Sequence, residues 1–255
     1  MPSFLHSIET AVPSHRHAQS DLGAEHASWF EEERARRLIS RASRNSGIES
    51  RHFVVEQFVN EAPFDERGEA TTGSRNQVFA IESRKLAKEA AGKLLQQEGA
   101  PRKEEITHLI FVTCTGFVNP GPDFHLIRDL GLRESTERYV IGFMGCYGAF
   151  PALRMASQFC KADSEAKVLI VCLELCSLHV QRDGTTDSIL GNTVFADGSA
   201  AAIVSSSPNG RPSYEIKRFA SAVIPGSESA MAWGIGNRGF DLALSSYVPQ
   251  VISSE

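Results

Sequence analysis

The sequence predicts an α/β fold in which buried parallel strands alternate with helices. Three continuous apolar runs, at 108–114, 138–145 and 167–175, have the length of strands and contain few charged residues. The segments between them carry apolar residues at helical spacing. Continuous apolar strands joined through helices are typical of a parallel sheet that is covered on both faces.

The expected elements alternate along the chain. The helix over 77–97 is amphipathic, because alanine side chains gather on one side and charged side chains on another. A turn rich in Pro and Gly at 119–122 precedes a short helix that ends near Gly131. In chain order we expect the helix at 77–97, a strand at 108–114, the short helix, a strand at 138–145, a helix at 147–160, and strands at 167–175 and 199–205.

A turn-rich stretch, SSSPNGRP at 205–212, divides the chain into two unequal parts. We expect residues 1–206 to form one lobe and residues 207–255 to begin a second. Residues 213–255 have the length for a strand or two and one helix, which is too little to cover a sheet on both faces.

Composition sets limits on function. The chain has 255 residues, of which 42% are hydrophobic and 22% charged, so it is long enough to bury a sizeable core. A formal net charge of -5 argues against nucleic-acid binding, whose usual signature is strongly basic. The N-terminus lacks the pattern of a targeting segment, and no apolar run is long enough to cross a membrane. We therefore expect a cytoplasmic protein with neither nucleic-acid nor membrane partners.

The cysteines predict neither disulfides nor a metal site. There are five, an odd count, and none forms a Cys-x-x-Cys pair. A disulfide framework is not expected in a reducing compartment. Cys172 and Cys176 are spaced to lie on one face of a strand-like run. No histidine or cysteine pair stands nearby to complete the four ligands of a zinc site.

Cys146 stands where an apolar strand turns directly into a helix. Free backbone N–H groups and the positive end of the helix dipole meet at that position, and both favour thiolate over thiol. Gly142, Gly145 and Gly148 keep side chains away from the sulfur and permit a tight turn. The pattern indicates a nucleophile; the alternative is a small buried apolar residue.

Several segments, taken in order, carry a family resemblance that no single one would establish. They are IETAVP at 8–13, SGIESR at 46–51, THLIFVTCTG at 107–116 followed by Pro120 and Gly121, GFMGCYG at 142–148, GNTVFADG at 191–198 and MAWGIGNRGF at 231–240. Together they resemble the N-terminal part of type III polyketide synthases, the chalcone and stilbene synthase family of the thiolase superfamily.

The resemblance implies a thiolase-like layered fold, αβαβα, with the N-terminal half complete and the C-terminal half truncated. It implies that Cys146 is acylated by a starter acyl-CoA and that malonyl-CoA is then decarboxylated and condensed onto the acyl group. A thiol suits this role because a thioester forms readily from another thioester and stays electrophilic. Both CoA thioesters are substrates, no cofactor is expected, and the family implies a homodimer.

The resemblance also assigns roles to residues beyond Cys146. Phe195 matches the gatekeeping phenylalanine, whose apolar face helps to exclude water from the decarboxylation. Arg41 aligns with an arginine that meets the phosphates of coenzyme A. Alternatives stay open: Phe195 as a core aromatic, and the other arginines near Arg41 as a solvated helix face. The residues matched to the substrate cavity, besides Phe195, are Cys114, Thr115, His179, Gly191 and Gly239, of which Cys114 and His179 have structural roles as their alternatives.

The histidine and asparagine that complete the family's catalytic unit come from the second lobe. None of the eight histidines of this chain stands in the matching context. We therefore expect a truncated chain that is acylated at most. The alternatives are a 3-oxoacyl-carrier-protein synthase of the initiating type, a cysteine hydrolase, and an inactive fragment that merely folds or dimerises. The hydrolase is disfavoured because Met144 occupies the first glycine position of the usual Gly-x-Cys-x-Gly elbow.

Overall fold

The computed structural model describes residues 1–56 and 70–244. The chain forms two compact units, each assembled from separate segments of the sequence. The first unit consists of Met1–Val12, Phe79–Leu175 and Gly198–Ala220, and the second of Pro13–Val78, Cys176–Asp197 and the residues from Ser221 onward.

A six-stranded mixed sheet is the centre of the first unit, with the strand order β5-β4-β6-β7-β1-β8. β4 pairs in parallel with β5 and with β6, as the apolar runs predict. β1 pairs antiparallel with both β7 and β8, so the far side of the sheet departs from the all-parallel expectation. The strands are β1 (Phe4–Ala11), β4 (His108–Thr113), β5 (Glu137–Gly142), β6 (Lys167–Leu175), β7 (Asp197–Ser205) and β8 (Tyr214–Glu215).

β4 and β6, two of the inner strands of this sheet, carry much of its core. Every residue of β4 is buried, and Ile110 and Ile170 pack in one apolar cluster with Ala152 and Ala156. The expectation that the 138–145 run is buried on both faces is wrong. β5 stops at Gly142 and is the edge strand, because among the described strands it pairs with β4 alone, and Val140 is 55% exposed.

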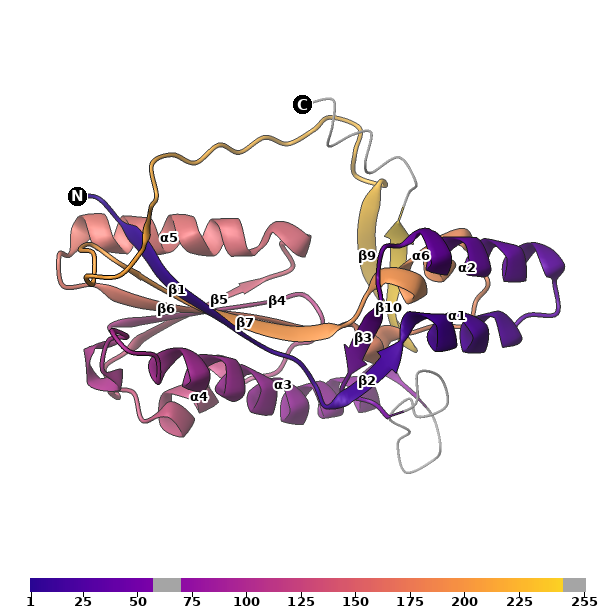
Figure 1. Ribbon diagram of the computed structural model, residues 1–255, viewed down its shortest axis with the longest axis horizontal. Helices are drawn as coiled ribbons and strands as arrows, with labels where there is room; N and C mark the ends of the chain where they lie inside the picture. The colour runs from indigo at the N-terminus through magenta and orange to yellow at the C-terminus, as the bar shows by residue number, and fades with distance from the viewer. Residues whose placement is uncertain (57–69, 245–255) are drawn as a thin grey trace. The chain divides into compact units, whose positions relative to one another are not determined.

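Helices cover both faces of this sheet. α5 (Ala149–Ala162) lies on one face, and α3 (Thr72–Leu95) and α4 (Pro122–Leu130) lie on the other (Figure 1). Gly131 ends α4 in a left-handed conformation with φ 69°, which glycine adopts without strain. α5 begins two residues later than the sequence suggests, because a 3-10 turn, η2 (Gly145–Tyr147), comes first.

α5 approaches β4 closely at Gly148, its N-terminal cap. A Cβ atom on Gly148 would lie 2.8 Å from Cγ1 of Val112. Val112 is buried in β4, and a β-branched side chain has little freedom to move aside. Glycine is therefore required here by packing, since the φ of −51° is ordinary for any residue.

The second unit contains short helices and two separate pairs of antiparallel strands, β2 with β3 and β9 with β10. Ala35, Ile39 and Ile189 form one small core, and Leu22 and Phe53 form another. Of the stretch 213–255, the described residues contain strands and no helix. The elements of the unit are β2 (His15–Ala18), α1 (Gln19–Ser28), α2 (Glu33–Asn45), β3 (Ser50–Phe53), η3 (Cys176–His179), α6 (Thr186–Val194), β9 (Met231–Gly236) and β10 (Gly239–Leu244).

No helix in residues 1–56 and 70–244 has both the length and the apolar character needed to span a bilayer. Over the same ranges, no three His, Cys, Asp or Glu side chains are grouped so that they could hold a metal ion.

Truncating a core residue of β4 should destabilise the protein far more than truncating an exposed residue of the same type. Ile110 is fully buried, whereas Ile81 on α3 is 57% exposed. We expect Ile110→Ala to lower the free energy of unfolding by about 2–5 kcal/mol. The control Ile81→Ala should change it by about 0.5 kcal/mol or less. Urea denaturation of the two variants measures both values, and equal losses would contradict the assigned core.

The contact between Gly148 and Val112 predicts a specific rescue. Gly148→Ala should cost about 1–3 kcal/mol through overpacking. In Val112→Ala/Gly148→Ala the two losses should be less than additive, because the smaller residue makes room for the new methyl group. Gly92→Ala is the control, since nothing lies within 4 Å of its Cβ position, and it should stabilise α3 by about 0.5–1 kcal/mol. Strict additivity in the urea-derived cycle would rule out the contact.

Candidate active site

The turn between β5 and α5 presents the Cys146 thiol to solvent. Cys146 is exposed and lies within the 3-10 turn η2, directly before α5. Gly145 precedes it with φ 68°, a left-handed conformation that glycine adopts at little cost. The strand, turn and helix expected from the sequence are therefore present, with one extra turn of 3-10 helix between strand and helix.

Phe143 shows that this turn is strained. Its φ is 59°, and it is the only non-glycine residue with a positive φ in the described part of the chain. A bulky residue in this conformation costs on the order of 1–3 kcal/mol, and such residues cluster at functional sites. Its ring lies edge-on to that of Phe117, with 6.5 Å between the ring centroids.

Cys114 supports the turn through a hydrogen bond to its backbone. The N–H of Gly145 donates to Sγ of Cys114 across 3.2 Å. Burial and the Glu174 carboxylate raise the pKa of the Cys114 thiol, while the N–H groups of Gly145, Met144 and Phe143 oppose that rise. Cys114, predicted to line the substrate cavity, therefore contacts the backbone of the turn that carries Cys146.

Glu174 organises the loop after β4. Its carboxylate accepts from the N–H of Cys114 at 2.9 Å and from the Thr115 hydroxyl at 2.7 Å. The Thr115 hydroxyl in turn accepts from the N–H of Leu175 at 2.8 Å. Burial raises the pKa of Glu174, and these hydrogen bonds partly offset the effect. Sequence reasoning missed Glu174, although a carboxylate inside the apolar run 167–175 was a signal.

The expected activation of Cys146 by the helix N-terminus is wrong in direction. Partial desolvation raises the pKa of the Cys146 thiol, the negative charge of Glu174 raises it further, and only its own backbone N–H opposes them. Two features explain the error. Cys146 precedes the first turn of α5 instead of lying in it, and the carboxylate that orders the neighbouring loop disfavours a second negative charge.

Phe195 lies in the second unit, at the C-terminal cap of α6. Its carbonyl accepts from Nη1 of Arg51 at 2.8 Å, and so does the carbonyl of Asn192. Gln19 accepts from Nε of Arg51 and donates to the carbonyl of Thr193, at 2.8 and 2.9 Å. Arg51 and Gln19 thus satisfy carbonyls that the helix end leaves unpaired, and they hold the backbone of Phe195 in place.

Arg51 and Asp197 form a buried, charged support around this helix end. Burial lowers the pKa of Arg51 to about 10, so it stays protonated at neutral pH, and it raises the pKa of Asp197 to about 6. Asp197 accepts from the N–H groups of Val54 and Ser177 at 2.7 and 2.8 Å. The sequence analysis includes Arg51 only within the matching segment 46–51, because its burial is a property of the tertiary structure.

Gly191 is positioned beside the Phe195 ring. A Cβ atom at Gly191 would lie 2.6 Å from Cδ2 of Leu242 and 3.6 Å from the ring of Phe195. The missing side chain therefore lets β10 approach α6. Gly191 and Phe195, both predicted for the substrate cavity, are brought together.

His179 and Gly239 are also neighbours. The His179 ring stacks on Phe240 with 3.9 Å between centroids, and Phe240 stacks in turn on Trp233 at 4.5 Å. Nδ1 of His179 accepts from the N–H of Phe240 at 3.3 Å. Gly239 has φ 118°, and a Cβ there would lie 3.3 Å from that same nitrogen. These contacts favour the structural alternative for His179.

Arg41 lies on the exposed face of α2, opposite the buried Ala35 and Ile39. Two neighbouring arginines are engaged locally: Arg37 pairs with Glu33, and Arg44 donates to the carbonyl of Ser40. Among the described residues Arg41 has no hydrogen-bonding or ion-pairing partner, so its guanidinium group is available to a ligand.

The predicted site residues thus fall into two groups. Cys146, Cys114 and Thr115 meet in the first unit around Glu174. The second group, in the second unit, comprises Phe195, Gly191, His179, Gly239 and Arg41.

Removing the Glu174 charge should make Cys146 more reactive. We expect Glu174→Gln to lower the pKa of the Cys146 thiol, because a neighbouring carboxylate disfavours the thiolate. Alkylation of Cys146 at pH 7.5, followed by peptide mass spectrometry, should then be faster than in the wild type. Glu134→Gln, an exposed change, is the control and should leave the rate unchanged. A slower or equal rate in Glu174→Gln would contradict the electrostatic role.

Comparisons with known proteins agree with this architecture. A family model described as chalcone and stilbene synthases, N-terminal domain, matches residues 2–208. The probable polyketide synthase 1 of Dictyostelium discoideum is 32% identical over 255 residues, which is 99% of this chain and 8% of that protein. The chain therefore spans a small part of the curated relative that it matches.

Two solved structures are similar over almost the entire chain. One is the C-terminal type III polyketide synthase domain of Steely1, a type I/III hybrid from Dictyostelium, with a TM-score of 0.85 and 30% identity over 100% of this chain and 70% of that one. The other is 1,3,6,8-tetrahydroxynaphthalene synthase from Streptomyces coelicolor A3(2), a bacterial type III polyketide synthase, with a TM-score of 0.86 and 28% identity over 98% of this chain and 70% of that one.

The family match over residues 2–208 and the likeness to both structures identify the α/β architecture as the thiolase-like fold of type III polyketide synthases, which are acyltransferases. This chain belongs to the chalcone and stilbene synthase family.

Proposed function

We propose that this chain carries the acyl-loading half of a type III polyketide synthase. The Cys146 thiolate attacks the carbonyl carbon of a starter acyl-CoA, a thioester forms on Sγ, and the thiol of coenzyme A leaves. The observation that carries the proposal is the exposed Cys146 on a strained turn between β5 and α5, in a chain of this family.

Extension would use malonyl-CoA as the second substrate. Loss of CO2 from malonyl-CoA generates a carbanion that attacks the carbonyl carbon of the Cys146 thioester. The bond from that carbon to Sγ breaks, the Cys146 thiolate leaves, and coenzyme A carries an acyl group that is two carbons longer. We assign Phe195 to excluding water from that step. This assignment is supported by the hydrogen bonds from Arg51 and Gln19 to the end of α6, which fix the backbone from which the Phe195 ring projects. We assign Arg41, with its available guanidinium group, to the phosphates of coenzyme A.

The edge of the first unit favours a homodimer. β5 is an edge strand with exposed Val140, and Phe143 and Phe150 nearby are 56% and 64% exposed. An unpaired strand edge with apolar side chains is a surface that proteins normally cover. We propose that a second copy of the chain covers it. We also propose a boundary near residue 206 between two lobes, which the end of the family match at residue 208 supports.

We expect the 255-residue chain to load an acyl group and not to extend it. The pKa of the Cys146 thiol is raised, and among the described residues the groups that act on it are Glu174, whose charge disfavours the thiolate, and its own backbone N–H. Neither supplies the positive charge that stabilises a thiolate, so we expect reaction at Cys146 to be slow.

Intact-mass spectrometry after incubation with an acyl-CoA tests the loading step. We expect one acyl adduct per chain, mapped to Cys146 and absent from Cys146→Ala. Cys160→Ala, which changes a fully buried thiol, should keep the adduct. Labelled malonyl-CoA added to the same mixture should give no multi-turnover product. An adduct that survives Cys146→Ala would overturn the assignment of the nucleophile, and released polyketide would overturn the limit to loading.

A further inference from the structure

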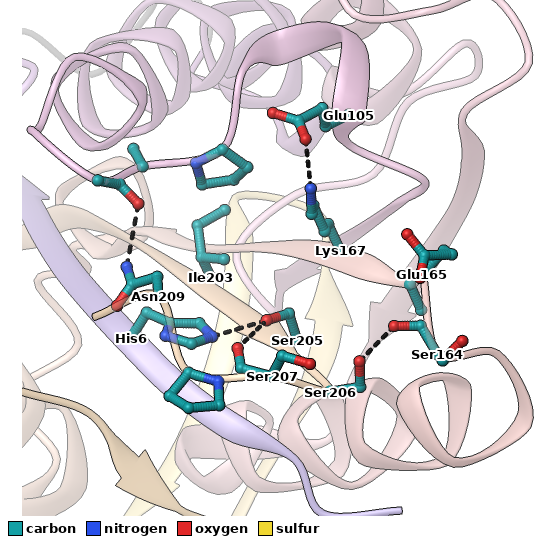
Figure 2. A pocket seen from close by; sticks show the side chains of 15 residues that line it. His6, Glu105, Ser164, Glu165, Lys167, Ile203, Ser205, Ser206, Ser207 and Asn209 are labelled. Carbon is teal, nitrogen blue, oxygen red and sulfur yellow. Dashed lines mark hydrogen bonds and ion pairs between the residues drawn. The ribbon is translucent and has the colours of Figure 1, made fainter. Parts of the chain in front are cut away.

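A cavity of about 410 Å³ lies in the first unit, away from Cys146 (Figure 2). Its wall includes Lys167, the first residue of β6, whereas Glu174 lies near the other end of that strand. Seven residues of extended strand separate the two by on the order of 20 Å. The acyl-transfer chemistry proposed for Cys146 makes no use of this cavity.

Two side chains in the wall form a pair typical of nucleophilic sites. Nε2 of His6, on β1, lies 2.7 Å from Oγ of Ser205, the last residue of β7. Figure 2 shows the His6 ring directed toward the Ser205 hydroxyl. A serine within hydrogen-bond reach of a histidine nitrogen can transfer its proton as it attacks a carbonyl carbon.

His6 occupies an irregular position in the sheet. Leu5 pairs with Val204 and Ser7 pairs with Ile203, so His6 is an extra residue in β1 and lies outside the regular pairing. Such bulges re-aim a side chain and are frequent next to active sites. The local structure therefore sets His6 apart from the alternating pattern of its strand.

His6 is suited to act as a base. Burial lowers its pKa, so the ring is neutral at pH 7 and one nitrogen can accept a proton. Nδ1 is buried without a hydrogen bond of good geometry, and the side chain of Asn209 is the polar group that acts on the ring. Asn209 is itself anchored, since its Nδ2 donates to the carbonyl of Gly99 at 3.0 Å.

Ser205 is held close to the cavity by a second contact. Its hydroxyl also donates to the carbonyl of Ser207 at 2.9 Å, so this carbonyl competes with Nε2 of His6 for the hydroxyl proton. That competition fixes the position of Oγ between two acceptors.

The walls select a small uncharged substrate. Lys167 is neutralised by an ion pair with Glu105, and this pair lowers the pKa of Glu105 to about 2. Apolar surface comes from Ile203 together with Pro101 and Pro208. The volume falls within the range of small-molecule sites. Among the described wall residues, Glu165 adds one exposed carboxylate, but there is neither an unpaired lysine or arginine for an anion nor a cluster of carboxylates for a cation.

We propose that His6 and Ser205 form a second nucleophilic site that accepts small neutral carboxylic esters. Oγ of Ser205 bonds to the ester carbonyl carbon and its proton passes to Nε2 of His6. The bond to the alcohol oxygen then breaks, and the alcohol leaves with that proton. Water attacks the acyl-serine, its proton passes through His6 to Oγ, and the carboxylic acid is released.

A fluorophosphonate probe tests this site independently of the thiol. The probe forms an Oγ–P bond as the P–F bond breaks, and fluoride leaves with the proton that His6 accepts. In a Cys146→Ala background, which removes the exposed thiol, we expect a single adduct that peptide mapping places on Ser205. The same background should hydrolyse p-nitrophenyl acetate, and Ser205→Ala should remove both signals.

The variants distinguish a reactive pair from a structural hydrogen bond. His6→Gln removes the base and should slow labelling by about 100-fold or more, since general base catalysis contributes about 10²–10⁴-fold. Ser206→Ala is the matched control, because its hydroxyl lines the same cavity but donates to the carbonyl of Ser164. It should label at the wild-type rate. Circular dichroism checks that each variant is folded. Absence of an adduct on Ser205 in the folded protein, or an unchanged rate in folded His6→Gln, would overturn the proposal.

Discussion

The site in the first unit depends on the parallel pairing of β4 with β5 on one side and with β6 on the other. Their register places Thr113 opposite Gly142 and Val112 opposite Cys172. Because the three strands run in one direction, the segments that follow them emerge at the same edge of the sheet. That edge therefore collects Cys114, Cys146 and Glu174 from distant parts of the sequence. Burial of β4 on both faces stabilises the pairing that makes this possible.

Glu174 creates a conflict between structure and chemistry at that edge. Its carboxylate orders the loop after β4 through Cys114 and Thr115, yet the same charge raises the pKa of both nearby thiols. The acyl loading proposed for Cys146 needs the opposite shift, so it requires an additional positively charged or basic group for efficient reaction. The described part of the first unit exposes the Cys146 thiol without lowering its pKa.

The second unit stabilises the C-terminal end of α6 with a buried positive charge. The end of α6 leaves carbonyl groups unpaired, and Arg51 brings both hydrogen-bond donors and a positive charge to the negative end of the helix. Asp197 balances the buried charge and ties Val54 and Ser177 to the same centre. These hydrogen bonds hold the backbone of Phe195 in place, independently of the contacts that its ring makes.

The sequence by itself determined the elements with a strong local pattern. Apolar runs gave the strand at 167–175 to the residue and the strand at 108–114 to within one, and the ordered motifs identified the family. Local pattern fails where a position depends on distant neighbours. It could not show that β5 is an edge strand, that Arg51 is buried and Glu174 partly buried, or that Cys146 precedes α5 beside a carboxylate. Burial and electrostatics are sums over residues far apart in the chain, so only the tertiary structure decided them.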